Sequence, residues 1–156
     1  MVATGGRSEG NPASRVSGFS IDSRSLKSGE GFIAIRGLNR DGHEFIPAAL
    51  DAGAACAVVE ETCHPSDEQR LVRVTDTFDA LNDLGRAGRD RAEAAVVIAV
   101  TGSVGKTGTK EALRRALEPS GTVHASSKSY NNHWGVPLTL ANMRRDIAYG
   151  VFEVGM

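Results

Sequence analysis

The sequence predicts an α/β protein built from two small units, the second of which has a parallel sheet flanked by helices. Short apolar runs alternate with segments whose apolar residues recur at helical spacing, which is typical of strand–helix repeats. A glycine-containing turn at residues 101–107 lies between one such run and one such helix, as in phosphate-binding α/β proteins. A length of 156 residues allows one domain or two small ones.

The first unit is expected at residues 16–77. Residues 1–15 are polar and rich in Gly, Ser and Asn, so we expect a flexible lead-in before it. Alternation and short apolar runs predict strands at 16–22, 31–35, 55–59 and 71–74. Helical spacing predicts a helix at 43–52 that ends at Gly53. The charged stretch 60–70 is expected to be an exposed loop.

The second unit is expected at residues 78–156, with the boundary near 75–85. The pattern predicts, in chain order, a helix at 77–91, a fully buried strand at 96–100, a helix at 107–118, a strand at 122–125, a helix at 136–142 and a strand at 149–154. The apolar faces of the first two helices are formed by Phe78, Leu81 and Leu84, and by Ala112, Leu113, Ala116 and Leu117. Three strands are few for a doubly wound sheet, so we expect either that the chain is a fragment with this unit truncated or that a partner completes it.

Composition and charge exclude several classes of protein. A net charge of −1 gives no electrostatic case for nucleic-acid binding, and no basic run suggests a membrane surface. No apolar stretch approaches the roughly 20 residues that span a bilayer, and the first residues lack the apolar core of a signal peptide. The two cysteines do not form a metal or disulfide pattern, and we expect a cytoplasmic protein.

One turn carries the clearest chemical signal in the sequence. The apolar run 96–100 leads into Thr-Gly-Ser-Val-Gly-Lys-Thr at 101–107. Gly102 and Gly105 allow backbone N–H groups to approach phosphate oxygens closely. A helix is expected to begin at the end of this turn, and helix N-termini favour anions. The turn is therefore expected to hold phosphate.

Two side chains at the end of this turn complete the prediction. Lys106 supplies a positive charge, and Thr107 offers a hydroxyl that can hold Mg²⁺. The pattern is shorter than the usual phosphate-loop motif, because Val100 occupies the place of its first glycine. We predict a nucleoside triphosphate site; the alternative is an ordinary strand–turn–helix.

Two further segments offer polar groups near this turn. Asn131 and Asn132 precede a predicted helix and either bind a polar ligand or form a capping turn. Glu153 lies in an apolar strand, where a buried carboxylate needs a partner or a metal. If its strand lies beside the turn, Glu153 points towards the Mg²⁺ position; the alternative is a solvent-facing residue.

The first unit also presents polar groups beside predicted strands and helices. Asp22, Ser23 and Arg24 follow a strand, and His43 precedes a helix. Ligands of α/β domains bind outside the carboxyl ends of strands, which favours these positions. Each segment is also typical of an ordinary turn or helix start.

Taken together, these motifs resemble the Mur ligases of bacterial cell-wall synthesis. The resemblance rests on five ordered segments, at 18–26, 41–45, 101–107, 130–140 and 151–156. It covers nearly the whole chain after about residue 16. It implies a three-domain enzyme in which a small N-terminal domain holds the UDP end of the substrate and a central domain binds ATP. This chain matches the first domain and the opening of the second, so we expect the C-terminal ligase domain to be absent.

The resemblance also implies roles for individual residues. ATP would be bound by Thr101, Gly102, Ser103, Val104, Gly105, Lys106 and Thr107, with Asn131 and Asn132 lining the junction with the substrate. Lys106 would be the catalytic residue, and Thr107 and Glu153 would hold Mg²⁺. The uridine diphosphate would be held by Ile21, Ser23, Arg24 and His43. The chain departs from the family pattern at Val104, at Gly108 and at His133-Trp134, none of which alters the lysine or the metal hydroxyl.

The implied activity is an ATP-dependent ligation of D-alanyl-D-alanine to UDP-N-acetylmuramoyl-tripeptide through an acyl phosphate. ATP and Mg²⁺ are then the cofactors, and the whole enzyme is expected to be a cytoplasmic monomer that serves peptidoglycan synthesis, cell shape and cell division. The residues of this chain alone are expected to be inactive. Three alternatives remain: a non-catalytic module that binds a UDP-sugar or nucleotide, another Mur ligase, and a small phosphate-loop kinase. The kinase is disfavoured because no spare arginine cluster is present for a lid.

Overall fold

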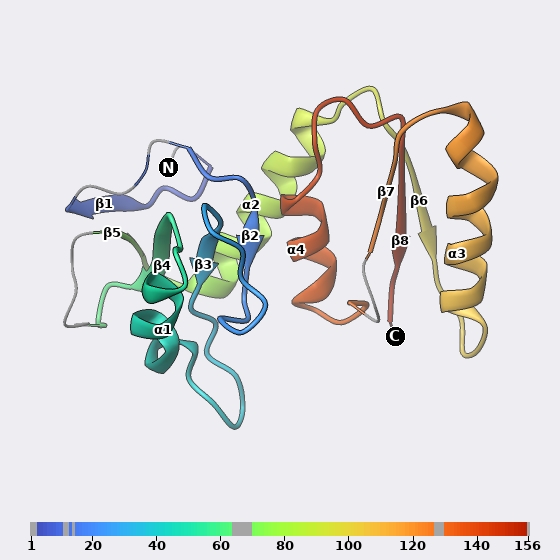
Figure 1. The fold of residues 1–156 in the computed structure, drawn as a ribbon. Helices are drawn as coiled ribbons and strands as arrows, with labels where there is room; N and C mark the ends of the chain where they lie inside the picture. Colours follow the sequence, from blue (N-terminus) through green and yellow to red (C-terminus); the bar gives the residue numbers. More distant parts are fainter. Residues whose placement is uncertain (1–2, 11–12, 14, 64–69, 127–129, 156) are drawn as a thin grey trace. The chain divides into compact units, whose positions relative to one another are not determined.

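The computed structural model describes residues 3–10, 13, 15–63, 70–126 and 130–155, and it divides the chain into two compact units, Met1–Asp83 and Leu84–Met156 (Figure 1). Both units are α/β with largely parallel sheets, which confirms the predicted fold class. Parts of the predicted lead-in and of the charged stretch 60–70 lie outside the described residues. Among the described residues, no helix is both long and apolar enough to cross a bilayer.

The first unit contains a five-stranded sheet. Its strands are β1 (Arg7–Gly10), β2 (Phe19–Ser20), β3 (Gly31–Ile33), β4 (Cys56–Glu60) and β5 (Arg70–Val74). They are ordered β1-β5-β4-β3-β2, and every neighbouring pair is parallel except β1 with β5. The apolar runs of β3, β4 and β5 are buried because they lie inside this sheet.

The structure differs from the sequence prediction at the N-terminus. A flexible lead-in was predicted for residues 1–15, whereas Arg7–Gly10 forms strand β1 and pairs antiparallel with β5. Its polar side chains are mostly exposed, so no apolar pattern marks it in the sequence. The pairing uses backbone hydrogen bonds, which any non-proline residue can make.

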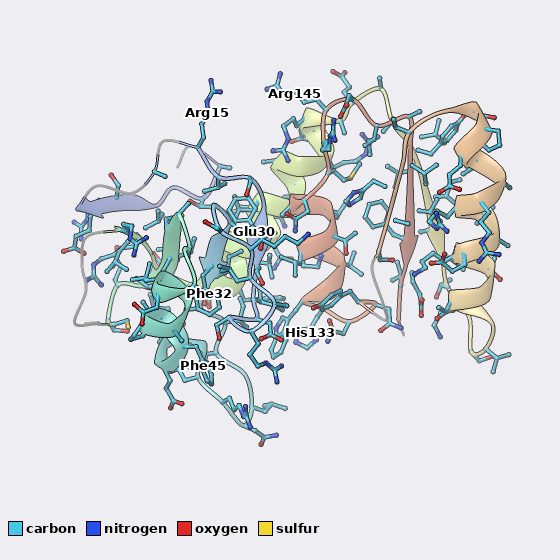
Figure 2. All side chains as sticks on the ribbon, in the orientation of Figure 1. Arg15, Glu30, Phe32, Phe45, His133 and Arg145 are labelled. Carbon is cyan, nitrogen blue, oxygen red and sulfur yellow. The ribbon has the colours of Figure 1, made fainter. Side chains whose placement is uncertain are left out.

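One apolar core lies between the sheet of the first unit and its short helices. The helices are η1 (Gly42–Phe45) and α1 (Ile46–Asp51). Phe32 of β3 is 1% exposed and packs with Ile46, Ala49 and Leu71, while Phe45 lies at the margin of this core (Figure 2). The apolar residues within 43–52 recur at helical spacing, and α1 buries the face on which they lie. The spacing in the sequence therefore indicated the position of this core.

The second unit has a three-stranded parallel sheet in the order β6-β8-β7. The strands are β6 (Val96–Val100), β7 (Val123–Ala125) and β8 (Tyr149–Glu153). The helices are α2 (Thr77–Arg91), which begins in the first unit, α3 (Lys106–Leu117), η2 (Glu118–Ser120) and α4 (Gly135–Ala141). Figure 1 shows α3 and α4 on opposite sides of this sheet, the arrangement that parallel strands require for burial.

The sheet register places the two ends of the predicted nucleotide site side by side. Val100 of β6 lies opposite Glu153 of β8. Both strands are parallel, so the turn that follows Val100 and the carboxylate of Glu153 lie at the same carboxyl edge. The sequence predicts that Glu153 lies beside the turn on the condition that their two strands are neighbours. The sheet meets this condition.

Two burial predictions for this unit are wrong. Residues 96–100 were expected to be fully buried, but Val96 is 55% exposed and Val97 38%, because β6 is an edge strand among the described residues. In α3, Ala112 and Ala116 are exposed, and the fully buried side chain of that helix is Lys110. Apolar spacing therefore gave the correct helix, but its more buried face contains Lys110, Leu113 and Leu117 and leaves out the two alanines.

Candidate functional site

The turn between β6 and α3 has the backbone shape that two glycines make possible. Gly102 has a φ of 138° and Gly105 a φ of 79°, both in the left-handed region that other residues rarely adopt. A Cβ atom added at Gly105 would meet nothing within 4 Å. Both glycines are therefore required by backbone conformation, and space is open beside Gly105.

The backbone amides of this turn are free to bind an anion. In the described part of the chain, the amides of residues 102–107 donate to no backbone carbonyl, and the first amide of α3 that does so is that of Thr109, to Gly105 O at 2.9 Å. The first amides of any helix lack a partner within that helix and carry its positive dipole end. The turn and the first helical turn together offer a phosphate cradle.

Lys106 lies at the first position of α3 and bonds back to the turn. Its Nζ donates to the carbonyl oxygen of Gly102 at 2.6 Å, which holds the ammonium over the loop. A carbonyl is a weaker partner for an ammonium than a phosphate oxygen. A bound nucleotide can therefore take over this hydrogen bond without a rearrangement of the helix.

Glu153 lies at the centre of the site, at the end of the central strand β8. It is 2% exposed, and both of its carboxylate oxygens are occupied. Thr107 Oγ1 donates to Oε2 at 2.9 Å, and Asn131 Nδ2 donates to Oε1 at 2.8 Å. The structure therefore brings together three of the residues predicted for this site.

The charge state of Glu153 follows from these contacts. Burial raises the pKa of its carboxyl group, because a low dielectric disfavours the anion. The hydrogen bonds from Asn131 and Thr107 and the positive charges of Lys110 and Lys106 outweigh burial, and the net pKa lies below its usual value. Glu153 is consequently an anion at neutral pH.

These side chains fit a magnesium ion. Adjacent ligands of an octahedral Mg²⁺, each about 2.0–2.1 Å from the metal, are about 2.9 Å apart. The 2.9 Å between the Thr107 hydroxyl and the Glu153 carboxylate is the length of the hydrogen bond between them, and it is also compatible with two adjacent ligands of one Mg²⁺. No cluster of three His, Cys, Asp or Glu residues suited to a metal occurs among the described residues. Mg²⁺ at nucleotide sites needs no such cluster, since phosphates and water supply the other ligands.

The two asparagines have different positions. Asn131 bonds to Glu153, and its backbone carbonyl accepts from Gly155 N at 2.6 Å. The side-chain oxygen of Asn132 accepts from the backbone of Trp134 at 3.2 Å and of Gly135 at 2.8 Å, so it caps α4. The capping alternative therefore describes Asn132, whereas Asn131 belongs to the carboxylate site.

The residues predicted to hold the uridine diphosphate lie in the first unit. Ile21, Ser23 and Arg24 form the turn directly after β2. The guanidinium of Arg24 donates to both oxygens of Asp22, at 2.9 and 2.8 Å, and is largely exposed. This turn leaves a cationic group at the end of a parallel strand, where ligands of α/β units bind.

His43, which the sequence analysis places among the ligand-binding residues, has both ring nitrogens bonded within the protein. Its Nδ1 lies 2.6 Å from Asp41 Oδ1, and its Nε2 accepts from the backbone of Glu60 at 3.0 Å. Arg36 pairs with both Asp41 and Glu60. Both ring nitrogens of His43 are thus used inside the protein, which ties loop 36–41 to the end of β4.

Lys110 and Ser126 belong to this site although the sequence analysis did not identify them. Lys110 Nζ donates to the carbonyl oxygen of Ser126 at 2.7 Å, and Ser126 Oγ accepts from the backbone of Glu153 at 3.1 Å. The signal for Lys110 was its spacing, since Lys110, Leu113 and Leu117 share one helical face. Ser126 has no comparable signal.

Sequence comparison assigns the family. The sequence profile of the Mur ligase family, catalytic domain, matches residues 15–92, and that of the Mur ligase middle domain matches residues 100–156. The chain belongs to the Mur ligase family. The two matched segments contain the two sets of site residues described above, one in each unit.

Individual relatives of this Mur ligase chain agree with that assignment. The UDP-N-acetylmuramoyl-tripeptide--D-alanyl-D-alanine ligase of Rickettsia prowazekii is 41% identical over 136 residues, which are 87% of this chain and 30% of the relative. The protein of that name from Synechocystis is 40% identical over 143 residues, 91% of this chain and 31% of the relative. The chain thus spans about a third of the length of the curated relatives that it matches.

Solved structures of Mur ligases have the same fold. A ligase structure from Acinetobacter baumannii aligns with a TM-score of 0.79 at 34% identity, over 90% of this chain and 31% of that one. The MurF ligase of Thermotoga maritima, solved in complex with ADP, aligns with a TM-score of 0.71 at 33% identity, over 88% of this chain and 32% of that one.

Proposed function

We propose that this chain provides the ATP-binding and UDP-substrate-binding parts of the ligase that joins D-alanyl-D-alanine to UDP-N-acetylmuramoyl-tripeptide. The observation that carries this proposal is the phosphate turn with its paired Thr107 and Glu153, 2.9 Å apart at one edge of a parallel sheet. The similarity to ligases of that name supports the choice of substrates.

The proposed chemistry activates a carboxylate in two steps. An oxygen of the tripeptide carboxylate attacks the γ-phosphorus of ATP, and the bond to ADP breaks, which leaves an acyl phosphate. The amine of D-alanyl-D-alanine then attacks the acyl carbon, loses a proton and displaces phosphate, so that an amide forms. The protein positions the reactants and stabilises the charge on the phosphoryl oxygens.

The residues of the turn have distinct proposed roles. The amides of residues 101–107, with Ser103 and Val104 among them, surround the β- and γ-phosphates, and Lys106 neutralises charge on the transferred phosphoryl group. Thr107 and Glu153 would hold Mg²⁺, which when bound screens the phosphate oxygens. Asn131 holds Glu153 in place, and Asn132 fixes the adjoining start of α4.

The uridine diphosphate is proposed to bind at the first unit. Arg24 and the Ser23 hydroxyl can hydrogen-bond its diphosphate, and Ile21 can contact the uracil base. His43 contributes by shaping the loop at 36–41 through its bonds to Asp41 and Glu60, because neither of its ring nitrogens is available to a ligand.

The same proposal concerns the cellular setting. Peptidoglycan precursors of this type are built in the cytoplasm, and Cys56 and Cys63 are free thiols, as a reducing compartment favours. We infer that the whole protein acts there as a monomer, in cell-wall synthesis and hence in cell shape and division.

Calorimetric titration and product analysis test the function together. The 156-residue chain is expected to bind ATP with Mg²⁺ and, separately, UDP-N-acetylmuramoyl-tripeptide, without measurable ATP hydrolysis. The protein as its gene encodes it is expected to release phosphate and form the UDP-linked pentapeptide only when D-alanyl-D-alanine is present. Turnover of ATP by the chain alone would contradict the proposal.

Two outcomes would favour other functions. Tight binding of a UDP-muramoyl substrate with a shorter peptide, and no binding of the tripeptide, would indicate another Mur ligase. Binding of both nucleotide ligands by the gene-encoded protein, with no product under any condition, would indicate a binding module.

A further inference from the structure

Lys110 is a buried charge whose presence needs a reason. It lies on α3, three residues after Thr107, and is 2% exposed. Burying an ammonium is costly unless it is well paired, and a methionine of similar length would fill this volume without that cost. A lysine on the buried face of a helix is therefore expected to do more than pack.

The partners of Lys110 connect it to the carboxylate site. Its Nζ donates to the carbonyl oxygen of Ser126 at 2.7 Å and pairs with Glu111 Oε1 at 3.1 Å. Charge-assisted hydrogen bonds are stronger than neutral ones, so the first contact holds Ser126 firmly against α3. Ser126 is itself 3% exposed, and it directly follows β7.

Ser126 in turn holds the backbone of the metal-site residue. The ladder between β7 and β8 ends at the pair Ala125 and Val151, before it reaches Glu153. Ser126 extends this contact, since its amide donates to Val151 O at 3.2 Å and its hydroxyl accepts from Glu153 N at 3.1 Å. Without Ser126, the last residue of β8 would lose its hydrogen bond on this side.

We propose that Lys110 is a positioning residue of the nucleotide–metal site, which acts through Ser126 on the backbone of Glu153. Thr107 and Lys110 lie on the same helix, so the contact from Lys110 to Ser126 fixes the distance between the Thr107 hydroxyl and the Glu153 carboxylate. That distance determines how well the two oxygens bind one Mg²⁺. This inference rests on the proposed ATP and Mg²⁺ site.

The test separates metal binding from nucleotide binding. In the protein as its gene encodes it, the affinity for fluorescently labelled ADP is measured across a Mg²⁺ titration and in EDTA. The variants are Lys110→Met and Ser126→Ala, and the control is Arg115→Met, which removes a positive charge from an exposed position of α3. Thermal unfolding of each variant shows whether it is folded.

Both variants are expected to raise the half-saturating Mg²⁺ concentration about tenfold, since residues that orient metal ligands have effects of that size. The ADP affinity in EDTA is expected to change less than about twofold, and Arg115→Met is expected to match the unaltered protein. The double variant is expected to need no more Mg²⁺ for half-saturation than the single variant with the larger effect, because both residues act through one chain of contacts. A purely structural role would weaken ADP binding equally with and without Mg²⁺, which would overturn the inference.

The remaining outcomes also decide. A Mg²⁺ dependence within about twofold of the unaltered protein in both variants would overturn the role of Lys110 and leave the proposed function intact. An effect of Lys110→Met without an effect of Ser126→Ala would overturn the route through Ser126. If Lys110→Met does not fold, an unchanged Mg²⁺ dependence in Ser126→Ala still overturns the route from Lys110 to Glu153. An unaltered protein without Mg²⁺-dependent ADP binding would overturn the proposed function as well.

Discussion

Two carboxylates in this chain, the buried Glu153 and the part-exposed Asp41, are stabilised by specific hydrogen-bond donors. Glu153 accepts from Thr107 and Asn131, and Asp41 accepts from the backbone and ring of His43 and from Arg36. Each hydrogen bond favours the anion over the neutral acid. At the scale of single residues, these donors determine where negative charge is held and how each unit responds to pH.

Asp41 gives a prediction about acid stability. Burial raises the pKa of Asp41, but the hydrogen bonds from His43 and Arg36 outweigh it and lower the pKa from 3.8 to about 2. A lowered pKa means that the anion stabilises the folded state above about pH 4, and that this stabilisation is lost as the pH falls towards about 2. Asp41→Asn should therefore destabilise the first unit by about 1–2 kcal/mol at pH 7, allowing for partial exposure.

The measurement is urea unfolding followed by NMR signals of the first unit, at several pH values between 7 and 2. The loss of stability caused by Asp41→Asn should become smaller as the pH falls. Asp51→Asn, at an exposed position of α1, is the control and should show a much smaller deficit at pH 7. If the loss of stability in Asp41→Asn stays constant with pH, the charge of Asp41 does not cause it.

At the scale of elements, close helix packing in the second unit depends on one glycine. A Cβ atom at Gly88 of α2 would lie 2.0 Å from the backbone oxygen of Leu140 in α4 and 2.8 Å from its carbonyl carbon. Backbone atoms of a helix cannot move aside as a side-chain end can. Gly88 therefore permits an approach of α2 to α4 that no other residue allows, although glycine weakens a helix.

Gly88→Ala should destabilise the second unit by about 1–3 kcal/mol, because overpacking outweighs the gain in helix propensity. Gly108→Ala in α3 is the matched control, since a Cβ atom there would meet nothing within 4 Å. It should stabilise the unit by about 0.5–1 kcal/mol. The fluorescence of Trp134, the only tryptophan, reports urea unfolding of both variants. Equal effects of the two substitutions would contradict the close-packing argument.

At the scale of the whole molecule, two units carry two separate sets of candidate site residues. Each has its own core, represented by Phe32 and Ile46 in the first and by Met143 and Phe152 in the second. The phosphate turn and Glu153 lie in the second unit, and Ser23 and Arg24 lie in the first. This division predicts that each ligand can be lost without the other.

Lys106→Ala should weaken ATP binding at least about tenfold, because it removes a charge-assisted hydrogen bond to phosphate. Binding of UDP-N-acetylmuramoyl-tripeptide should stay within about twofold, as measured by calorimetry on the same preparation. Lys27→Ala, which removes an exposed lysine of the first unit, should leave ATP binding unchanged. Loss of both ligands in Lys106→Ala would argue against two sites.

Local pattern was enough to predict most elements of this chain. The helix predicted at 77–91 is α2 (Thr77–Arg91), and the strand predicted at 96–100 is β6 (Val96–Val100). The strand predicted at 16–22 shortens to Phe19–Ser20, and β1 was not predicted, because its pairing leaves no apolar trace. The buried face of α3 was predicted wrongly because packing against the sheet decides it: Lys110 is buried, whereas Ala112 and Ala116 are exposed.

The sequence alone determined the α/β class, the turn at 101–107 with its two glycines, and the residue types that we propose to hold phosphate and metal, since these follow from neighbouring residues in the chain. The tertiary structure decided which distant groups meet. Glu153 lies 46 residues after Thr107 yet accepts its hydrogen bond, and Lys110 reaches Ser126, because β8 lies between β6 and β7 in the sheet. Strand order is a long-range property, so no local pattern contains it.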